Sequence, residues 1–144
     1  MPAKQQSTEN STKPLPAIDD LTRPFWHAAT QHQLMIQHCQ DCNYFNHPPR
    51  PLCDACLSQR LEFVLVSGRG TVYSYTIMHQ PNIAGFEKEI PYINMLVELD
   101  EQPQLFMVSY LPISEQAKLR IGGQVEVMFE KIDDEVTLPQ FRLV

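Results

Sequence analysis

The chain has 144 residues, of which 43% are hydrophobic, and this is enough for one ordinary domain or two very small ones with a buried core. No stretch approaches the ~18 consecutive apolar residues that a membrane-spanning helix needs, so we expect no membrane partner. The formal net charge is −6, and an acidic chain repels the phosphate backbone of nucleic acid unless its charges are segregated.

Residues 1–17 are rich in Ser, Thr, Gln, Lys and Pro, a composition typical of a disordered tail. This segment lacks the apolar middle of a secretory signal, and it has no Arg-rich amphipathic pattern of a transit peptide. We therefore expect a cytoplasmic protein, in a compartment where thiols stay reduced.

Residues 18–34 are predicted to form a short N-terminal helix. Asp19 offers an N-cap oxygen, and Pro24 suits a first helical turn. Phe25 and Trp26 form the only large aromatic pair outside the strand region that follows. The pair either anchors the helix onto the rest of the protein or docks a partner protein, and the sequence leaves both interpretations open.

All four cysteines lie in one short segment as two Cys-x-x-Cys pairs, Cys39 with Cys42 and Cys53 with Cys56. A two-residue gap lets a tight turn direct both sulfurs at one ion, and four thiolates complete the tetrahedral shell of zinc at ~2.3 Å. Disulfides are disfavoured in a reducing compartment. We predict a zinc ribbon over residues 35–62, with iron in a rubredoxin-type site as the alternative.

Four protein ligands leave no open position for water or substrate, so the metal is expected to be structural. It would hold together a segment that is too small for its own core. His38 and His47 lie beside the ligands, and with four cysteines present they are interpreted as surface or surrounding groups. The motif therefore explains stability and does not by itself name a function.

Residues 63–144 are predicted to form a small β-barrel. Apolar and polar residues alternate in "GTVYSYTIMH", "YINMLVEL", "QLFMVSYL" and "QVEVMFEK", and a fifth strand is expected near "VTLPQFRLV". Gly68 and Gly70 bracket a bend or bulge at the start, and Gly122–Gly123 supplies a turn. About five short strands favour a five-stranded OB-fold, with a small SH3-like barrel as the competing topology.

Between the first two of these strands lies "QPNIAGFEKEIP", residues 80–91. The segment is long for a hairpin loop and carries the apolar residues Ile83 and Phe86. It is either a functional loop or an Ω-loop that packs on its own barrel.

Catalytic motifs are absent from the sequence. It contains no Gly-x-Ser-x-Gly, phosphate loop, Rossmann glycine pattern or His-Glu-x-x-His. His79 ends a strand beside the long loop and is interpreted as a capping or surface residue rather than a general base. Glu98, Asp100 and Glu101 are typical of a solvated turn. We predict no catalytic residue in this chain.

Taken in order, these pieces resemble a known family, the acyl-CoA-associated proteins with a rubredoxin-like zinc ribbon followed by an OB-fold, long known as domain of unknown function 35. The resemblance runs from about Pro16 to Val144. It rests on Phe25-Trp26, "LMIQHCQDC", "PPRPLCDAC", "SGRGTVYSYT", "IPYINMLVELDE", "IGGQVEV" and "LPQF". The family often has Gly directly after each Cys-x-x-Cys turn, here called a knuckle, but this chain has Asn43 and Leu57 at those positions. The family also commonly has Gly at the end of the helix, where this chain has Gln31-His32-Gln33.

The resemblance implies a non-catalytic accessory subunit in acyl-CoA metabolism, either of lipids, of polyketides or of steroid side chains. Such a subunit is expected to form a hetero-oligomer with a thiolase-like enzyme. The barrel would hold acyl-CoA, and the ribbon and helix would dock the partner, with Phe25 and Trp26 as the contact residues.

Because CoA is anionic, the basic residues Arg50, Arg69 and Lys88 are expected to meet its phosphates. Tyr73, Ile83 and Phe86 are expected to line a nonpolar channel for its pantetheine arm.

Two other function classes stay open. One is a nucleic-acid-binding module, because zinc ribbons and OB-folds both serve there. The charge count argues against this class, because the sequence after Gly68 contains only six basic residues and eleven acidic ones. The other is a freestanding enzyme or redox protein, which iron in the cysteine site would favour.

Overall fold

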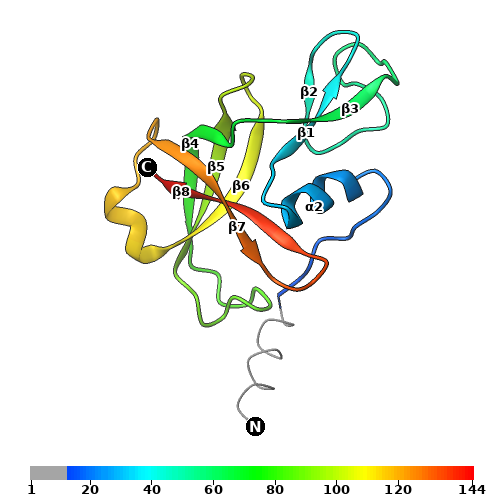
Figure 1. Ribbon diagram of the computed structural model, residues 1–144. Helices are drawn as coiled ribbons and strands as arrows, with labels where there is room; N and C mark the ends of the chain where they lie inside the picture. The colour runs from blue at the N-terminus through cyan, green and yellow to red at the C-terminus, as the bar shows by residue number, and fades with distance from the viewer. Residues whose placement is uncertain (1–12) are drawn as a thin grey trace.

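The computed structural model describes residues 13–144 (Figure 1). The described elements are the helix α2 (Arg23–Thr30), the strands β1 (Met35–Cys39), β2 (Phe45–Asn46), β3 (Leu61–Leu65), β4 (Arg69–Met78), β5 (Tyr92–Leu99), β6 (Phe106–Pro112), β7 (Gln124–Lys131) and β8 (Thr137–Leu143), and the 3-10 helix η1 (Ile113–Lys118). This order confirms the predicted mainly β fold with a leading helix, a ribbon and a barrel. No helix in the described part of the chain is long and apolar enough to cross a membrane.

The disorder predicted for residues 1–17 concerns mainly residues 1–12, which lie outside the described residues. Lys13 is in a defined place, because its Nζ lies 2.6 Å from Glu89 Oε1. The same ammonium group lies 4.8 Å from the centre of the Phe86 ring. The first described residue is therefore tied to the loop between β4 and β5.

The helix α2 is shorter than the predicted range 18–34. The residues before it form a turn, in which Thr22 N donates to Asp19 Oδ1 at 2.8 Å. After the helix, His32 takes a left-handed conformation with φ 58°, which ends the helical path. One face of the helix is buried, and it consists of Phe25, Ala28 and Ala29.

The ribbon contains a three-stranded antiparallel sheet in the order β2-β1-β3. Along its whole length β3 pairs with β1, from Met35 opposite Leu65 to Cys39 opposite Leu61. The predicted boundary between residues 62 and 63 thus falls inside a strand of the ribbon sheet. Three residues later the chain enters β4, and the connecting Val66 is buried and donates its N–H to Leu34 O at 3.0 Å.

The barrel is a five-stranded antiparallel sheet in the order β6-β5-β4-β7-β8, the OB-fold that was predicted. Its two outer strands, β6 and β8, meet through side chains. Gln140 Oε1 accepts hydrogen bonds from Ser109 Oγ at 2.9 Å and from Tyr110 N at 3.0 Å. Phe141 N donates to Ser109 Oγ at 2.8 Å. These bonds close the barrel at this seam.

The predicted period two is present in two barrel strands, where alternate residues are buried. In β5 the residues Ile93, Met95, Val97 and Leu99 are at most 1% exposed. In β6 the buried positions are Met107, Ser109 and Leu111, while Val108 between them is 67% exposed. In β4 the alternation ends at a bulge between Val72 and Ser74, after which both kinds of position are exposed.

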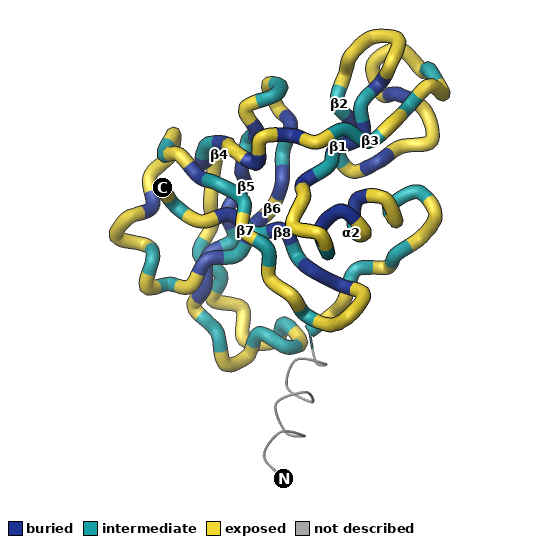
Figure 2. The backbone as a smooth tube through the Cα atoms, in the orientation of Figure 1, coloured by how far each residue is buried: buried dark blue, intermediate teal, exposed yellow. Residues whose placement is uncertain are grey.

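The ribbon and the barrel share one apolar core. The helix α2 packs on β1 of the ribbon and on β7 and β8 of the barrel (Figure 1). Phe25, Leu34 and Ile36 belong to the same buried cluster as the barrel residues Val97 and Phe141. Buried positions run along the barrel strands and the inner side of α2, whereas the tip of the ribbon is mostly exposed (Figure 2).

The long loop between β4 and β5 packs on its own barrel. Phe86 stacks on Tyr92 with 5.0 Å between ring centres and lies 6.4 Å from the ring of Tyr110. Ile83 is half-buried in the same loop. The geometry is that of the Ω-loop alternative, with the aromatic ring of the loop turned onto the barrel.

Candidate functional site

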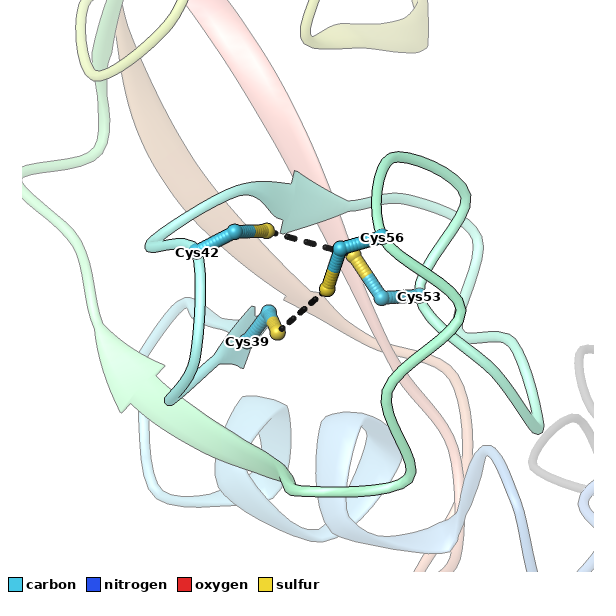
Figure 3. Close-up of side chains that lie close together, drawn as sticks. All are labelled: Cys39, Cys42, Cys53 and Cys56. Carbon is cyan, nitrogen blue, oxygen red and sulfur yellow. Dashed lines mark hydrogen bonds between the residues drawn. The ribbon is translucent and has the colours of Figure 1, made fainter.

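The four cysteine side chains converge from two turns of the ribbon (Figure 3). The Sγ atoms of Cys39 and Cys56 lie 3.6 Å apart, as do those of Cys42 and Cys53. All four sulfurs lie within 4.8 Å of one another. A tetrahedral zinc ion at ~2.3 Å from each sulfur spaces the sulfurs by about 3.8 Å, whereas a disulfide needs about 2.05 Å. The spacing therefore fits one tetrahedral metal ion.

The two turns have the same backbone geometry. Asn43 N donates to Cys39 O and Leu57 N donates to Cys53 O, each at 2.9 Å. The residue after each knuckle is left-handed, with φ 66° at Asn43 and φ 65° at Leu57. These are the two positions where the resembled family often has Gly, because Gly adopts this conformation without steric cost.

Backbone hydrogen bonds lower the pKa of Cys39 and Cys53, whereas burial and the neighbouring cysteine sulfurs raise the pKa of Cys42 and Cys56. Burial raises the pKa of Cys53, but hydrogen bonds from the backbone amides of Cys56 and Ala55 help to outweigh it, and the pKa falls to about 6. One of these donors, Ala55 N, lies 3.4 Å from Cys53 Sγ. Thiolates held together in this way attract a cation, which is what a soft divalent metal supplies.

Four cysteines fill a tetrahedral shell, so the site supports a structural metal and leaves no position for substrate. Neither nearby histidine belongs to the ligand group. His38 packs on Phe45 with 4.7 Å between ring centres, and His47 packs on Phe25 at 5.2 Å. Both imidazoles therefore surround the ribbon core, as the sequence indicated.

The six residues predicted to meet acyl-CoA do not lie together. Arg50 is in the ribbon, where its Nε lies 3.5 Å from Asp54 Oδ2. Arg69 is at the start of β4, opposite Glu126 of β7. Of the remaining four, Ile83, Phe86 and Lys88 belong to the loop between β4 and β5, and Tyr73 lies on the barrel surface at the bulge of β4.

A groove of about 940 Å³ lies between η1 and the strands β6, β7 and β8. It is lined by both apolar and charged side chains, among them Tyr110, Lys118, Arg120, Met128, Gln140 and Arg142. Burial raises the pKa of Tyr110, and the nearby Glu89 and Glu130 raise it further. The groove adjoins the long loop, because Tyr110 also contacts Phe86.

Sequence reasoning missed this groove. Its residues come from three strands, from η1 and from the turn after η1, so no single stretch of the sequence indicates it. The one signal in the sequence is the pair Lys118 and Arg120 just before the Gly122-Gly123 turn. No other residue among 13–144 forms a hydrogen bond or an ion pair with either of these two side chains.

The two predicted docking residues have different surroundings. Phe25 is 5% exposed and belongs to the core, so its ring anchors α2 and offers little surface to a partner. Trp26 is half-buried and meets Phe25 edge to face, with 4.9 Å between ring centres. Trp26 also lines a smaller hollow of about 300 Å³, which it shares with the exposed Val108 of β6.

Two protein-family descriptions match consecutive parts of the chain. Residues 26–62 match "ChsH2, rubredoxin-like zinc ribbon domain". Residues 63–130 match "ChsH2, C-terminal OB-fold domain". Together they cover the four-cysteine ribbon and most of the barrel.

Curated relatives and a solved structure agree with these matches. A "Probable enoyl-CoA hydratase alpha subunit" from Thermomonospora curvata is 39% identical over 144 residues, which are 98% of this chain and only 44% of that longer protein. A "DUF35 domain-containing scaffold protein" from Pyrococcus furiosus is 32% identical over 109 residues, 75% of this chain and 77% of that protein. The structure described as "Ltp2-ChsH2(DUF35) aldolase" superposes with a TM-score of 0.77 and 38% identity, covering 90% of this chain and 98% of that one.

Proposed function

Because this chain belongs to the DUF35 family of zinc-ribbon and OB-fold proteins, we propose that it is a non-catalytic accessory subunit that binds acyl-CoA and a thiolase-like enzyme. One observation carries the non-catalytic part: the four cysteines fill the coordination shell of the metal. In addition, no hydrogen bond joins a Ser, Thr or Cys side chain to a histidine side chain among the described residues. We infer that the protein holds a substrate or a partner rather than transforming one.

The names of the relatives support the accessory role. One relative is a subunit of an enoyl-CoA enzyme, another is a scaffold protein, and the solved relative combines Ltp2 and ChsH2 in an aldolase. We infer that this chain likewise works in a hetero-oligomer, in the cytoplasm, on acyl-CoA of lipid, polyketide or steroid side-chain metabolism.

The groove beside η1 is the place where acyl-CoA fits best. Its volume of about 940 Å³ lies within the range of ligand sites, roughly 300–1,000 Å³. The side chains of Lys118 and Arg120, which pair with no residue among 13–144, would meet phosphate oxygens. None of the six residues predicted from the sequence lines this groove; Phe86 adjoins it through Tyr110, and Ile83 and Lys88 belong to the same loop as Phe86. Arg50, Arg69 and Tyr73 lie outside this groove, so they contribute only through a partner or a second surface.

The partner would cover the apolar surface around Trp26. From the Trp26 hollow this surface continues over Val108, which is 67% exposed, to Tyr75, which is 38% exposed. The described residues offer no basic stripe to nucleic acid, because Lys131 and Arg142 are paired with Asp134 and Glu126.

The test is a co-purification from native lysate with identification of the bound proteins by mass and a metal assay on the same sample. We expect a stoichiometric thiolase-like enzyme and about one zinc per chain. The variant Val108→Glu should lose the partner, whereas Ile121→Glu, a matched change at another site that is 62% exposed, should keep it. A zinc-loaded chain without a thiolase-like partner would contradict the proposal.

Acyl-CoA binding is tested separately by calorimetry with acetyl-CoA on the purified complex. Lys118→Glu combined with Arg120→Glu should weaken binding at least tenfold, since two phosphate contacts become repulsive. Arg23→Glu is the matched control, because Arg23 is equally exposed and lies on α2, away from the groove. Unchanged affinity in the double variant would exclude the groove as the acyl-CoA site.

A further inference from the structure

The groove beside η1 carries opposite charges at its two ends. The charged side chains that line it are Glu115, Lys118, Arg120, Glu130 and Arg142. Within η1, Glu115 belongs to the first turn and Lys118 to the last. Arg120 precedes the start of β7, whereas Glu130 is close to the end of this strand. Both elements therefore run between a basic end and an acidic end of the groove.

Tyr110 lies at the acidic end. Its backbone N–H donates to Gln140 Oε1 at 3.0 Å, and Gln140 of β8 is opposite Met128 of β7. Glu130 is two residues further along β7, so its side chain is on the same side of the strand as that of Met128. Burial raises the pKa of the Tyr110 phenol, and the carboxylates of Glu89 and Glu130 raise it further, because negative charge near the hydroxyl disfavours the phenolate.

Glu130 is an unpaired carboxylate. Its side chain forms no ion pair with another residue among 13–144. Beside it, the surface is aromatic, since the ring of Tyr110 lies 5.5 Å from that of Tyr92 and 6.4 Å from that of Phe86. This end of the groove therefore offers apolar rings together with negative charge.

Two cations near these residues are already paired with carboxylates. Arg142 of β8 donates from Nε to Glu126 Oε1 at 2.7 Å. The ammonium group of Lys13 lies 5.9 Å from the centre of the Tyr110 ring, but it is paired with Glu89 Oε1 at 2.6 Å. Neither side chain thus brings an unpaired positive charge to the acidic end.

We propose that the groove selects acyl-CoA with an uncharged acyl group over acyl-CoA whose acyl group ends in a carboxylate. The inference rests on the proposed function, in which acyl-CoA occupies this groove. With the phosphates at Lys118 and Arg120, the acyl group extends towards Tyr110. There the aromatic rings favour an apolar chain, and Glu130 repels a second carboxylate, so the wrong ligand is excluded by charge as well as by lost contact.

The test compares butyryl-CoA with succinyl-CoA by calorimetry on the purified, zinc-loaded complex. The two acyl groups have the same number of carbon atoms, and only the succinyl group ends in a carboxylate. We expect succinyl-CoA to bind about tenfold more weakly at low ionic strength. The difference should shrink as salt is added, because salt screens exposed charges.

Glu130→Gln removes the repelling charge and keeps the size of the side chain. Because Glu130 is exposed, the variant should fold normally, and it should narrow the difference between the two thioesters to about threefold. Glu135→Gln is the matched control, since Glu135 is also exposed, lies in the turn between β7 and β8 and does not line the groove. The control should keep the full difference.

The outcomes separate this inference from the proposed function. Equal affinities for the two thioesters in the wild-type complex would overturn the preference while leaving acyl-CoA binding in place. A difference that Glu130→Gln does not narrow, or that Glu135→Gln narrows equally, would overturn the assignment to this end of the groove. Binding of neither thioester would contradict the proposed function itself, and the inference with it.

Discussion

The side-chain amide of Gln102 hydrogen-bonds both backbone groups of Phe45, accepting from the N–H at 2.9 Å and donating to the carbonyl oxygen at 3.0 Å. Gln102 lies in the turn between β5 and β6 of the barrel, and Phe45 lies in β2 of the ribbon. One side chain thus takes the place of a further strand at the outer edge of the ribbon sheet. It fixes the ribbon on the barrel at a second point besides α2.

We predict that Gln102→Ala lowers the free energy of unfolding by about 1–3 kcal/mol, because two partly buried hydrogen bonds are lost. The Phe45 amide should exchange its hydrogen faster. Denaturant unfolding with saturating zinc and hydrogen exchange by NMR measure the two effects. Gln116→Ala, the same change in the exposed part of η1, should alter neither. Unchanged exchange at Phe45 would contradict the prediction.

Leu57 combines a left-handed backbone, φ 65°, with a side chain that is 70% exposed. A β-carbon in this conformation costs roughly 1–2 kcal/mol, of which the greater chain entropy of Gly offsets a part. Leu57→Gly should therefore raise the free energy of unfolding by about 0.5–1 kcal/mol in the zinc-loaded protein. Chemical denaturation measures the change. Leu57→Ala keeps the β-carbon and should bring no gain, and an equal gain from both variants would argue against relief of backbone strain.

Gly70 is required by a close approach between β4 and β5. A β-carbon there would lie 2.4 Å from the carbonyl oxygen of Glu98, which is backbone and cannot rotate away. We expect Gly70→Ala to lower the free energy of unfolding by roughly 2–3 kcal/mol. Gly122→Ala should cost only about 1 kcal/mol, because a β-carbon at Gly122 has no neighbour within 4 Å and meets only the strain of φ 81°. Urea unfolding of both variants is the measurement, and equal losses would disprove the steric argument.

His47 makes stability depend on pH. Burial lowers its pKa from 6.5 to about 4 in the folded chain, so between these values the unfolded chain binds a proton that the folded chain does not. The contribution of neutral His47 to the free energy of unfolding is therefore fully present above pH 6.5. It falls by up to about 3 kcal/mol as the pH decreases towards 4.

The comparison for His47 is with His47→Phe, which keeps an aromatic ring against Phe25 and removes the titration. Unfolding free energies are measured from pH 7 downwards in excess zinc. Protonation of the cysteine ligands affects both proteins, so the difference between the two isolates His47. We expect the wild-type protein to lose more stability on acidification than the variant, and parallel curves would refute the assignment.

Much of this fold can be predicted from the sequence, because its signals are local. The two-residue gaps of the cysteine pairs predict the metal turns, and the alternation in β5 predicts a buried face that includes Ile93 and Leu99. The Gly residues at 68 and 70 predict a bend or bulge at the start of β4; Gly68 is left-handed with φ 76°, whereas the bulge lies further along, between Val72 and Ser74.

The rest could not be predicted, because it depends on polar side chains that act between distant segments. Gln102 and Gln140 look like ordinary surface residues in the sequence, yet one fixes the ribbon and the other closes the barrel. The bulge beside Tyr73 interrupts the alternation of β4, and no Gly or Pro at this position indicates it in the sequence. The residues expected to bind acyl-CoA are separated in the structure, because similar charge or hydrophobicity does not show that two residues lie close in space.

The shared core has a consequence for how this protein can change over evolution. Phe25 and Ile36 pack in the same cluster as Phe141 at the far end of the chain, and Val66 joins the two parts by a buried connection. Helix, ribbon and barrel therefore pack as one unit, so we expect that exchanging one of them alone would disturb the packing of the others. We expect loss of the metal to lower the stability of the barrel as well as that of the ribbon, so a mutation that destabilises one part also affects the other.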